Sequence, residues 1–252
     1  MTNISLLKGT FCYDEYKLIL KNLKNKNTTF EDTLNSEFNI LRHDVEFNVD
    51  RAQKIGSIDK EYGIKSTFFV QVISSAYNPF SIKNKTKILS LVEMGHVVGL
   101  HFYISHVPLN NLKKLEDEFN LQKKIFETGL GLPCKIFSFH RPAPHSWILD
   151  IREDYLFGSI NAYGPSFFEY SSNPKKIKYI ADSNHRWKYG HPLDNQNYSK
   201  MQILIHPDEW SDINNLSELD FLKSLVDDDR KDFISTVDEE LGSFAPYREK
   251  IK

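Results

Sequence analysis

The chain has 252 residues, 40% hydrophobic and 26% charged, which is typical of a folded globular protein and excludes a disordered one. Its net charge of -2 gives no electrostatic reason to expect nucleic acid or an anionic membrane as a partner. The two cysteines, Cys12 and Cys134, lack CxxC spacing and indicate neither a disulfide framework nor a thiolate zinc site. The N-terminal residues have no basic-then-apolar signal pattern, and no apolar stretch reaches the ~18 residues of a membrane helix, so we expect a cytoplasmic protein.

In chain order, residues 1–37 form a lead-in segment with a predicted helix at 11–22. Apolar, β-branched runs then alternate with amphipathic helical patterns. The predicted strands are residues 38–41, 66–72, 97–100, 135–139, 156–160, 178–181 and 202–205. The later predicted helices are residues 48–62, 86–94, 109–128, 217–226 and 229–241.

Polar side chains follow most of the predicted strands. They are Asp44, Glu46, His101, His140, Arg141, Asp182 and His206. Strands that alternate with helices are typical of a parallel sheet, which brings these side chains to one edge. We therefore expect a single α/β domain over residues 1–252, with the barrel strands in 39–210 and C-terminal helices in 211–252.

Asp44 and Glu46 are two residues apart at the end of a predicted strand, so their side chains point to the same side. Two carboxylates this close repel each other unless a cation or a shared proton intervenes. A carboxylate with two imidazoles suits Zn²⁺ or another divalent transition metal. The alternative is a pair of solvated loop carboxylates, and each histidine taken alone could be an ordinary core or surface residue.

Together, these motifs resemble those of the polysaccharide deacetylases of the NodB-homology type, carbohydrate esterase family four, in a divergent branch. Residues 42–46, Arg-His-Asp-Val-Glu, are similar to an Asp-x-Asp form of the first motif, with Glu as the second acid. Residues 94–101 resemble the approach to the histidines of the second motif, and 139–144 resemble the third motif without its Tyr. Residues 182–187 and 204–206 are similar to the fourth and fifth motifs, so that the resemblance spans about 39–210.

The resemblance implies a distorted (β/α)7-type barrel and four catalytic residues. Asp44 would be the general base, and Arg141 would orient it. His206 would protonate the leaving amine, and Asp182 would orient an imidazole or the Arg.

The resemblance also implies three metal ligands, Glu46, His101 and His106. His106 lies five residues after His101 where the family has four, so His140 is the alternative third ligand. The residues expected to bind substrate are His140, Trp187 and Trp210.

The function implied is metal-dependent removal of an N-acetyl group from an amino sugar. Zn²⁺ is the expected ion, with Co²⁺, Ni²⁺ or Mn²⁺ as alternatives. A cytoplasmic protein would act on a sugar nucleotide or glycan precursor in surface-polysaccharide synthesis. Two alternatives stay open: a carbohydrate-binding or scaffolding protein without turnover, and an amidase that acts on a non-sugar C–N bond, since a fold does not fix a substrate.

Overall fold

The computed structural model describes residues 7–32, 37–169, 176–214, 216–242 and 247, so that the two ends of the predicted domain, 1–6 and 248–252, lie outside the described residues. The chain divides into two compact units, Met1–Asn215 and Leu216–Lys252. In the part of the chain that is described, no helix is long and apolar enough to cross a membrane.

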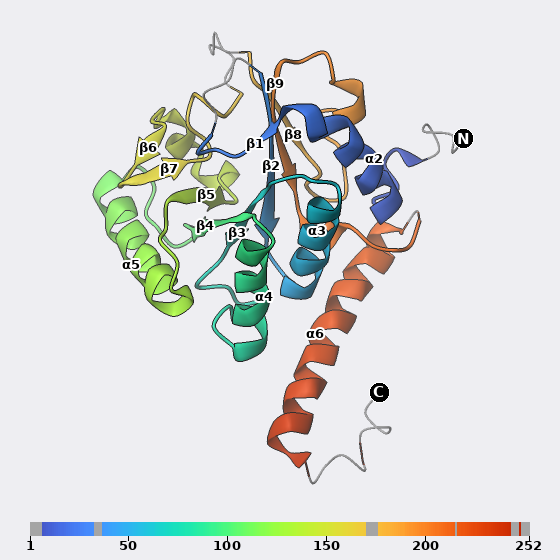
Figure 1. Cartoon of the computed structure of the whole chain (residues 1–252). Helices are drawn as coiled ribbons and strands as arrows, with labels where there is room; N and C mark the ends of the chain where they lie inside the picture. Colours follow the sequence, from blue (N-terminus) through green and yellow to red (C-terminus); the bar gives the residue numbers. More distant parts are fainter. Residues whose placement is uncertain (1–6, 33–36, 170–175, 215, 243–246, 248–252) are drawn as a thin grey trace. The chain divides into compact units, whose positions relative to one another are not determined.

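The first unit is built on a nine-stranded sheet that curls into a half-barrel (Figure 1). The strand order is β6-β7-β5-β4-β3-β2-β9-β8, with β1 beside β2, and every pairing is parallel except that of β6 with β7. The strands are β1 (Asn27–Thr28), β2 (Phe38–Val45), β3 (Thr67–Val70), β4 (Val97–Tyr103), β5 (Ile136–His140), β6 (Tyr155–Leu156), β7 (Ser159–Asn161), β8 (Lys178–Ala181) and β9 (Lys200–Ile205). The predicted α/β fold with a distorted barrel is confirmed.

Helices follow most of the central strands, as predicted. They are α2 (Tyr13–Leu23), α3 (Val49–Glu61), α4 (Ile82–Glu93) and α5 (Leu112–Leu130). Helix α3 begins shortly after β2, because the Asn48 side chain accepts hydrogen bonds from two backbone N–H groups in the first turn of the helix. Helix α5 ends at Gly131, whose φ of 75° is a left-handed conformation that glycine adopts without strain.

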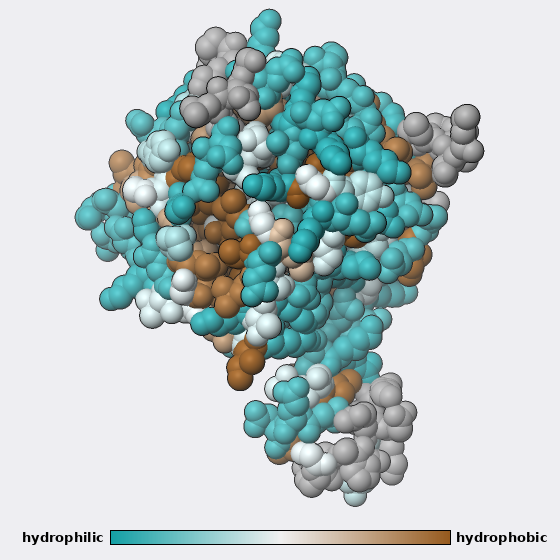
Figure 2. Space-filling model, in the orientation of Figure 1, coloured by the Kyte–Doolittle hydropathy of each residue, from teal (hydrophilic) through white to brown (hydrophobic). Residues whose placement is uncertain are grey.

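The pleat of β2 divides its side chains between two faces. Leu41 and Val45 pack in the large core between sheet and helices, and Ile40 packs in a second core on the concave face. His43 faces the helices as well, where it contacts Asp59 of α3 at 2.8 Å. The next concave-face residue after Ile40 is Arg42, so this face changes from apolar to polar toward the strand ends. One outer view of the molecule is mainly hydrophilic, with apolar side chains gathered over the region of β3, β4 and β5 (Figure 2).

The predicted strand at 156–160 is instead a hairpin of two short strands, β6 (Tyr155–Leu156) and β7 (Ser159–Asn161). The two residues between them, Phe157 and Gly158, have φ of 51° and 77°. Two consecutive left-handed residues make the tight turn that antiparallel strands favour. The apolar pattern alone did not reveal this turn.

The second unit contains α6 (Glu218–Glu240). The prediction of two helices here was wrong, because no glycine or proline interrupts these residues and the acidic run in the middle stays helical. The Ser217 side chain caps the helix by accepting a hydrogen bond from the Asp220 N–H. No described residue of α6 is buried.

Candidate metal centre

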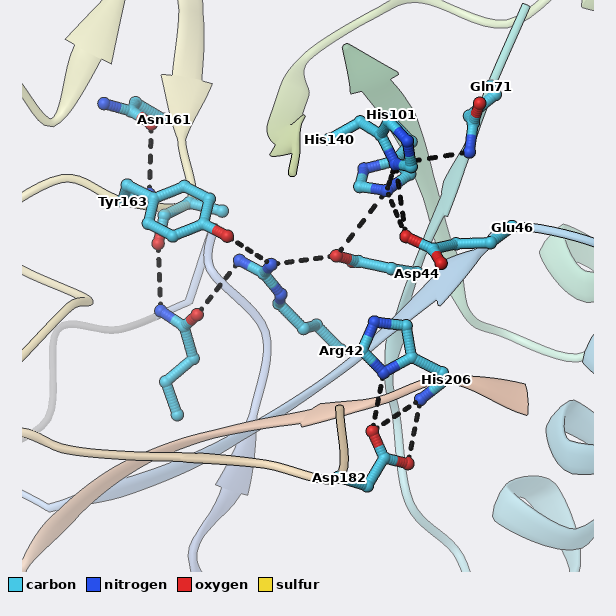
Figure 3. A network of polar contacts seen from close by, with 12 residues as sticks. Arg42, Asp44, Glu46, Gln71, His101, His140, Asn161, Tyr163, Asp182 and His206 are labelled. Atoms are coloured by element: carbon cyan, nitrogen blue, oxygen red, sulfur yellow. Dashed lines mark hydrogen bonds and ion pairs between the residues drawn. The ribbon is translucent and has the colours of Figure 1, made fainter. Parts of the chain in front are cut away.

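Three side chains meet at the carboxyl ends of the central strands (Figure 3). Glu46 follows β2, His101 lies in β4 and His140 is the last residue of β5. The Glu46 Oε1 atom lies 3.1 Å from His140 Nδ1 and 3.6 Å from His101 Nε2, and the two imidazole nitrogens are 3.1 Å apart. Both imidazoles are buried. The carboxyl ends of parallel strands in one curled sheet thus bring together three residues that are far apart in the sequence.

These three donor atoms fit a divalent transition metal. Ligands bound at about 2.0–2.1 Å in a tetrahedral arrangement lie roughly 3.3–3.4 Å apart. The separations of 3.1, 3.1 and 3.6 Å lie on either side of that value. Burial raises the pKa of Glu46, but hydrogen bonds from His101 and His140 and the charge of His206 outweigh it and hold that pKa well below its usual value. Glu46 is therefore ionised, as a ligand must be.

The third member of this group is His140, the alternative in the sequence analysis, and not His106. The His106 side chain is 51% exposed, and its Nε2 lies 3.1 Å from Glu118 Oε2 of α5. Tyr103 stacks on both histidines, with ring centroids 5.2 Å from His140 and 6.1 Å from His106. Because β4 continues to Tyr103 before the chain turns, the five-residue spacing carries His106 outward to α5.

A buried guanidinium holds the predicted base, Asp44. The Arg42 Nη2 atom donates to Asp44 Oδ2 at 2.9 Å and to the Tyr163 hydroxyl at 3.0 Å, and its Nη1 donates to Gln202 Oε1 at 3.1 Å (Figure 3). Burial lowers the pKa of Arg42, but Asp44 and Tyr163 more than offset this, so that its pKa is above the usual value. The Asp44 Oδ1 atom is buried and, among the described residues, has no hydrogen-bond partner. One oxygen of the carboxylate is thus fixed, and the other is left to accept a proton.

Arg141 does not have the predicted role of orienting Asp44. It is exposed, has a left-handed φ of 48°, and follows the last residue of β5. His140 takes the concave-face position at the end of this strand, so the next side chain points away from that face. The guanidinium that contacts Asp44 belongs to Arg42.

His206 and the buried Asp182 form a second pair at this edge of the sheet. The Asp182 Oδ1 atom lies 2.7 Å from His206 Nδ1, and both carboxylate oxygens accept from the His206 backbone N–H at 3.0 Å. Burial lowers the pKa of His206, but the charge and hydrogen bond of Asp182, with the charges of Glu46 and Asp44, raise it to about 10. His206 is therefore an imidazolium at neutral pH, and Figure 3 shows its other ring nitrogen on the side of Asp44.

The two tryptophans expected to bind substrate pack behind this pair. Trp210 is 0% exposed, and its indole N–H donates to Asp182 Oδ2 at 2.8 Å, so it supports Asp182 and offers no surface to a substrate. The Trp187 ring lies 6.1 Å from that of Trp210 and 5.9 Å from that of Phe11. The lead-in segment therefore packs against the fourth motif through Phe11.

No protein family model matches the chain, and no curated protein matches it. The chain is similar in fold to solved members of carbohydrate esterase family four. A wild-type pseudoenzyme of this family from Bacillus anthracis is 14% identical, with a TM-score of 0.45, and the match covers 79% of this chain and 62% of that one. The chain therefore spans less than two thirds of that protein.

Two further structures match at similar levels. A mutant of the peptidoglycan deacetylase PdaC from Bacillus subtilis is 18% identical, with a TM-score of 0.44, over 84% of this chain and 98% of that one. A family 4 acetyl xylan esterase from Clostridium thermocellum, in complex with a cobalt ion, is 14% identical, with a TM-score of 0.39, over 67% and 73%. The chemistry of this chain is therefore inferred from its own site.

Three residues near the site, Arg42, Gln202 and Asp208, are not among those predicted from the sequence. The contact of Arg42 with Asp44 could have been predicted, because Arg42 precedes Asp44 by two residues and strand alternation places both side chains on one face. The contact of Gln202 with Arg42 could not have been predicted, since it depends on the pairing of β9 with β2. Asp208, two residues after His206, is 2% exposed, and burial and the charge of Glu46 raise its pKa to about 7.

Proposed function

We propose that this chain is a divergent, metal-dependent deacetylase of the polysaccharide deacetylase type, which hydrolyses the N-acetyl group of an amino sugar. The ligands would be Glu46, His101 and His140, and Zn²⁺ is the first ion to test. The observation that carries the proposal is the convergence of these three donors on one point beside a carboxylate and an imidazolium. The order of the sequence motifs supports the same reaction class.

Each neighbouring side chain has a role in that hydrolysis. A bound divalent ion supplies Lewis-acid polarisation of the acetyl carbonyl and lowers the pKa of water toward ~7. The free Oδ1 of Asp44 accepts the proton of the attacking water, while Arg42 holds the other oxygen in place. His206 donates its proton to the amide nitrogen as the C–N bond breaks, and Asp182 holds the imidazolium. The products are acetate and the free amine.

The test begins with metal content and acetate release. Purified protein is expected to bind about one Zn²⁺ or Co²⁺ per chain and to release acetate from an acetamido sugar, with sugar nucleotides and chitin oligosaccharides as the first substrates. A chelator should stop the release, and re-addition of metal should restore it. The control is His101→Ala, which should lose metal and activity together.

Two results would redirect the proposal. If the protein takes up no metal after reconstitution, the metal-dependent mechanism is excluded. A protein that binds metal and sugar but releases no acetate would be a carbohydrate-binding protein with this fold, and acetate released only from non-sugar amides would make it an amidase of another class.

A further inference from the structure

A short helical turn after β9 reaches across to the residue that follows Glu46. This turn, η4 (Pro207–Glu209), carries Asp208, whose carboxylate Oδ2 accepts a hydrogen bond from the Phe47 backbone N–H at 3.2 Å. The backbone carbonyl of Asp208 accepts a second one from Arg51 Nη1 of α3 at 2.7 Å. The turn is thus tied to the segment between β2 and α3 at two points.

Glu46 needs such a tie, because it lies just beyond the end of β2. The last residue of β2 paired in the sheet is Val45, which lies opposite Val70. The carbonyl of Val45 accepts a hydrogen bond from the Tyr77 hydroxyl at 2.9 Å, which anchors the chain before Glu46. After Glu46, the Phe47 side chain is 49% exposed, and the hydrogen bond from its backbone N–H to Asp208 holds the chain before the cap of α3 begins at Asn48.

The burial of Asp208 indicates that the contact is specific. Its side chain is almost fully buried, and its Oδ1 atom has no hydrogen-bond partner among the described residues. A buried carboxylate oxygen without a partner destabilises the fold, and an apolar residue would fill the same space without that cost. What an apolar residue lacks is an acceptor for the Phe47 N–H.

We propose that Asp208 is a positioning residue for the metal ligand Glu46. By fixing the peptide between Glu46 and Phe47, it sets the direction of the glutamate side chain toward His101 and His140. This inference rests on the proposed function, because it assigns Asp208 a part in metal binding. Groups that orient metal ligands in this way typically contribute about 10–100-fold to metal affinity.

The experiment measures Zn²⁺ affinity by competition with a chromogenic chelator. Asp208→Ala should weaken the affinity by about 10–100-fold while the thermal midpoint of the metal-free protein changes little. Asp208→Asn keeps an oxygen that accepts from the Phe47 N–H, and it should bind within a few-fold of the parent. In the Co²⁺ form, the visible spectrum should change in the alanine variant and not in the asparagine variant.

Glu209→Gln is the matched control. Glu209 lies on the same turn and is also buried, but its carboxylate pairs with His185 at 2.9 Å, whereas the Phe47 N–H donates to Asp208. It should bind Zn²⁺ as the parent does. Arg51→Met removes the second hydrogen bond that holds the turn, and it should weaken the Zn²⁺ affinity by less than Asp208→Ala does. If the alanine variant does not fold, Arg51→Met becomes the test of the inference.

Several outcomes would overturn the inference. One is parent-like affinity in Asp208→Ala, or in Arg51→Met if the alanine variant does not fold. Another is an equal loss in the alanine and asparagine variants, which would show that the charge of Asp208 matters and not its hydrogen bond. Failure of the proposed function is distinguishable, because the parent itself would then bind no metal.

Discussion

Replacing Arg42 by methionine removes the group that holds Asp44. The guanidinium is 0% exposed, and Asp44 is 3% exposed, so the variant would leave an ionised carboxylate in the interior. His101 Nε2 lies 3.8 Å from Asp44 Oδ2, too far for a hydrogen bond that would replace the guanidinium. Breaking a buried ion pair by removing one partner costs about 3–5 kcal/mol, a large part of the 5–15 kcal/mol that is typical for the stability of a domain.

A double-mutant cycle isolates this pair. Asp44→Asn removes the charge that Arg42 neutralises, so the double variant Arg42→Met with Asp44→Asn should cost less than the sum of the two single changes, by about 1–3 kcal/mol. The measurement is urea unfolding of the metal-free protein, followed by tryptophan fluorescence. Arg141→Met is the matched control, and since Arg141 is exposed it should change the stability by less than about 0.5 kcal/mol.

Two results would refute the reasoning about Arg42. Strictly additive costs in the cycle would mean that the two charges do not stabilise each other in the fold. A loss of stability in Arg141→Met as large as that in Arg42→Met would mean that Arg141 orients Asp44, as the resemblance to the third motif implied.

Three further predictions concern the site. His140→Ala should lower Zn²⁺ affinity by at least about 10–100-fold, and His106→Ala should lower it by less than about two-fold. If a chelator titration gives the reverse order, the third ligand is His106 and not His140. Asp44→Asn should keep its metal by elemental analysis and lose roughly 10²–10⁴-fold in acetate release, whereas loss of metal would make Asp44 a ligand. The pKa of His206 is raised to about 10 from an ordinary 6.5, so its contribution to stability is complete below pH 6.5 and is lost as the pH rises through 10. The stability difference between the metal-free parent and His206→Gln should therefore shrink across that window in urea unfolding, and a constant difference would contradict the shift.

The fold could be predicted largely from hydrophobic periodicity, and the location of the site from the polar residues that end each strand. The choice of His140 over His106 as the third member of the candidate site could not, because it depends on how far β4 extends and on the path of the following turn, where His106 pairs with Glu118. The role of Arg42 could have been predicted, since the alternation that pairs Asp44 with Glu46 applies equally two residues earlier. Gln202 could not, because register between strands far apart in sequence is a tertiary property.

The charges of the site suit the proposed hydrolysis. The pKa of the Glu46 carboxylate is held below its usual value and that of the His206 imidazolium is raised to about 10, so each group keeps its charge in the presence of the other. Hydrolysis of an amide needs both, because a ligand or base must stay ionised while a nearby acid keeps the proton that the leaving nitrogen requires. In this chain Glu46 and His206 have those opposite shifts, and nearby the buried Asp44 Oδ1 atom has no hydrogen-bond partner among the described residues. Structural ion pairs show the same opposite shifts, so the change in acetate release of Asp44→Asn, and not the shifts, decides between turnover and binding.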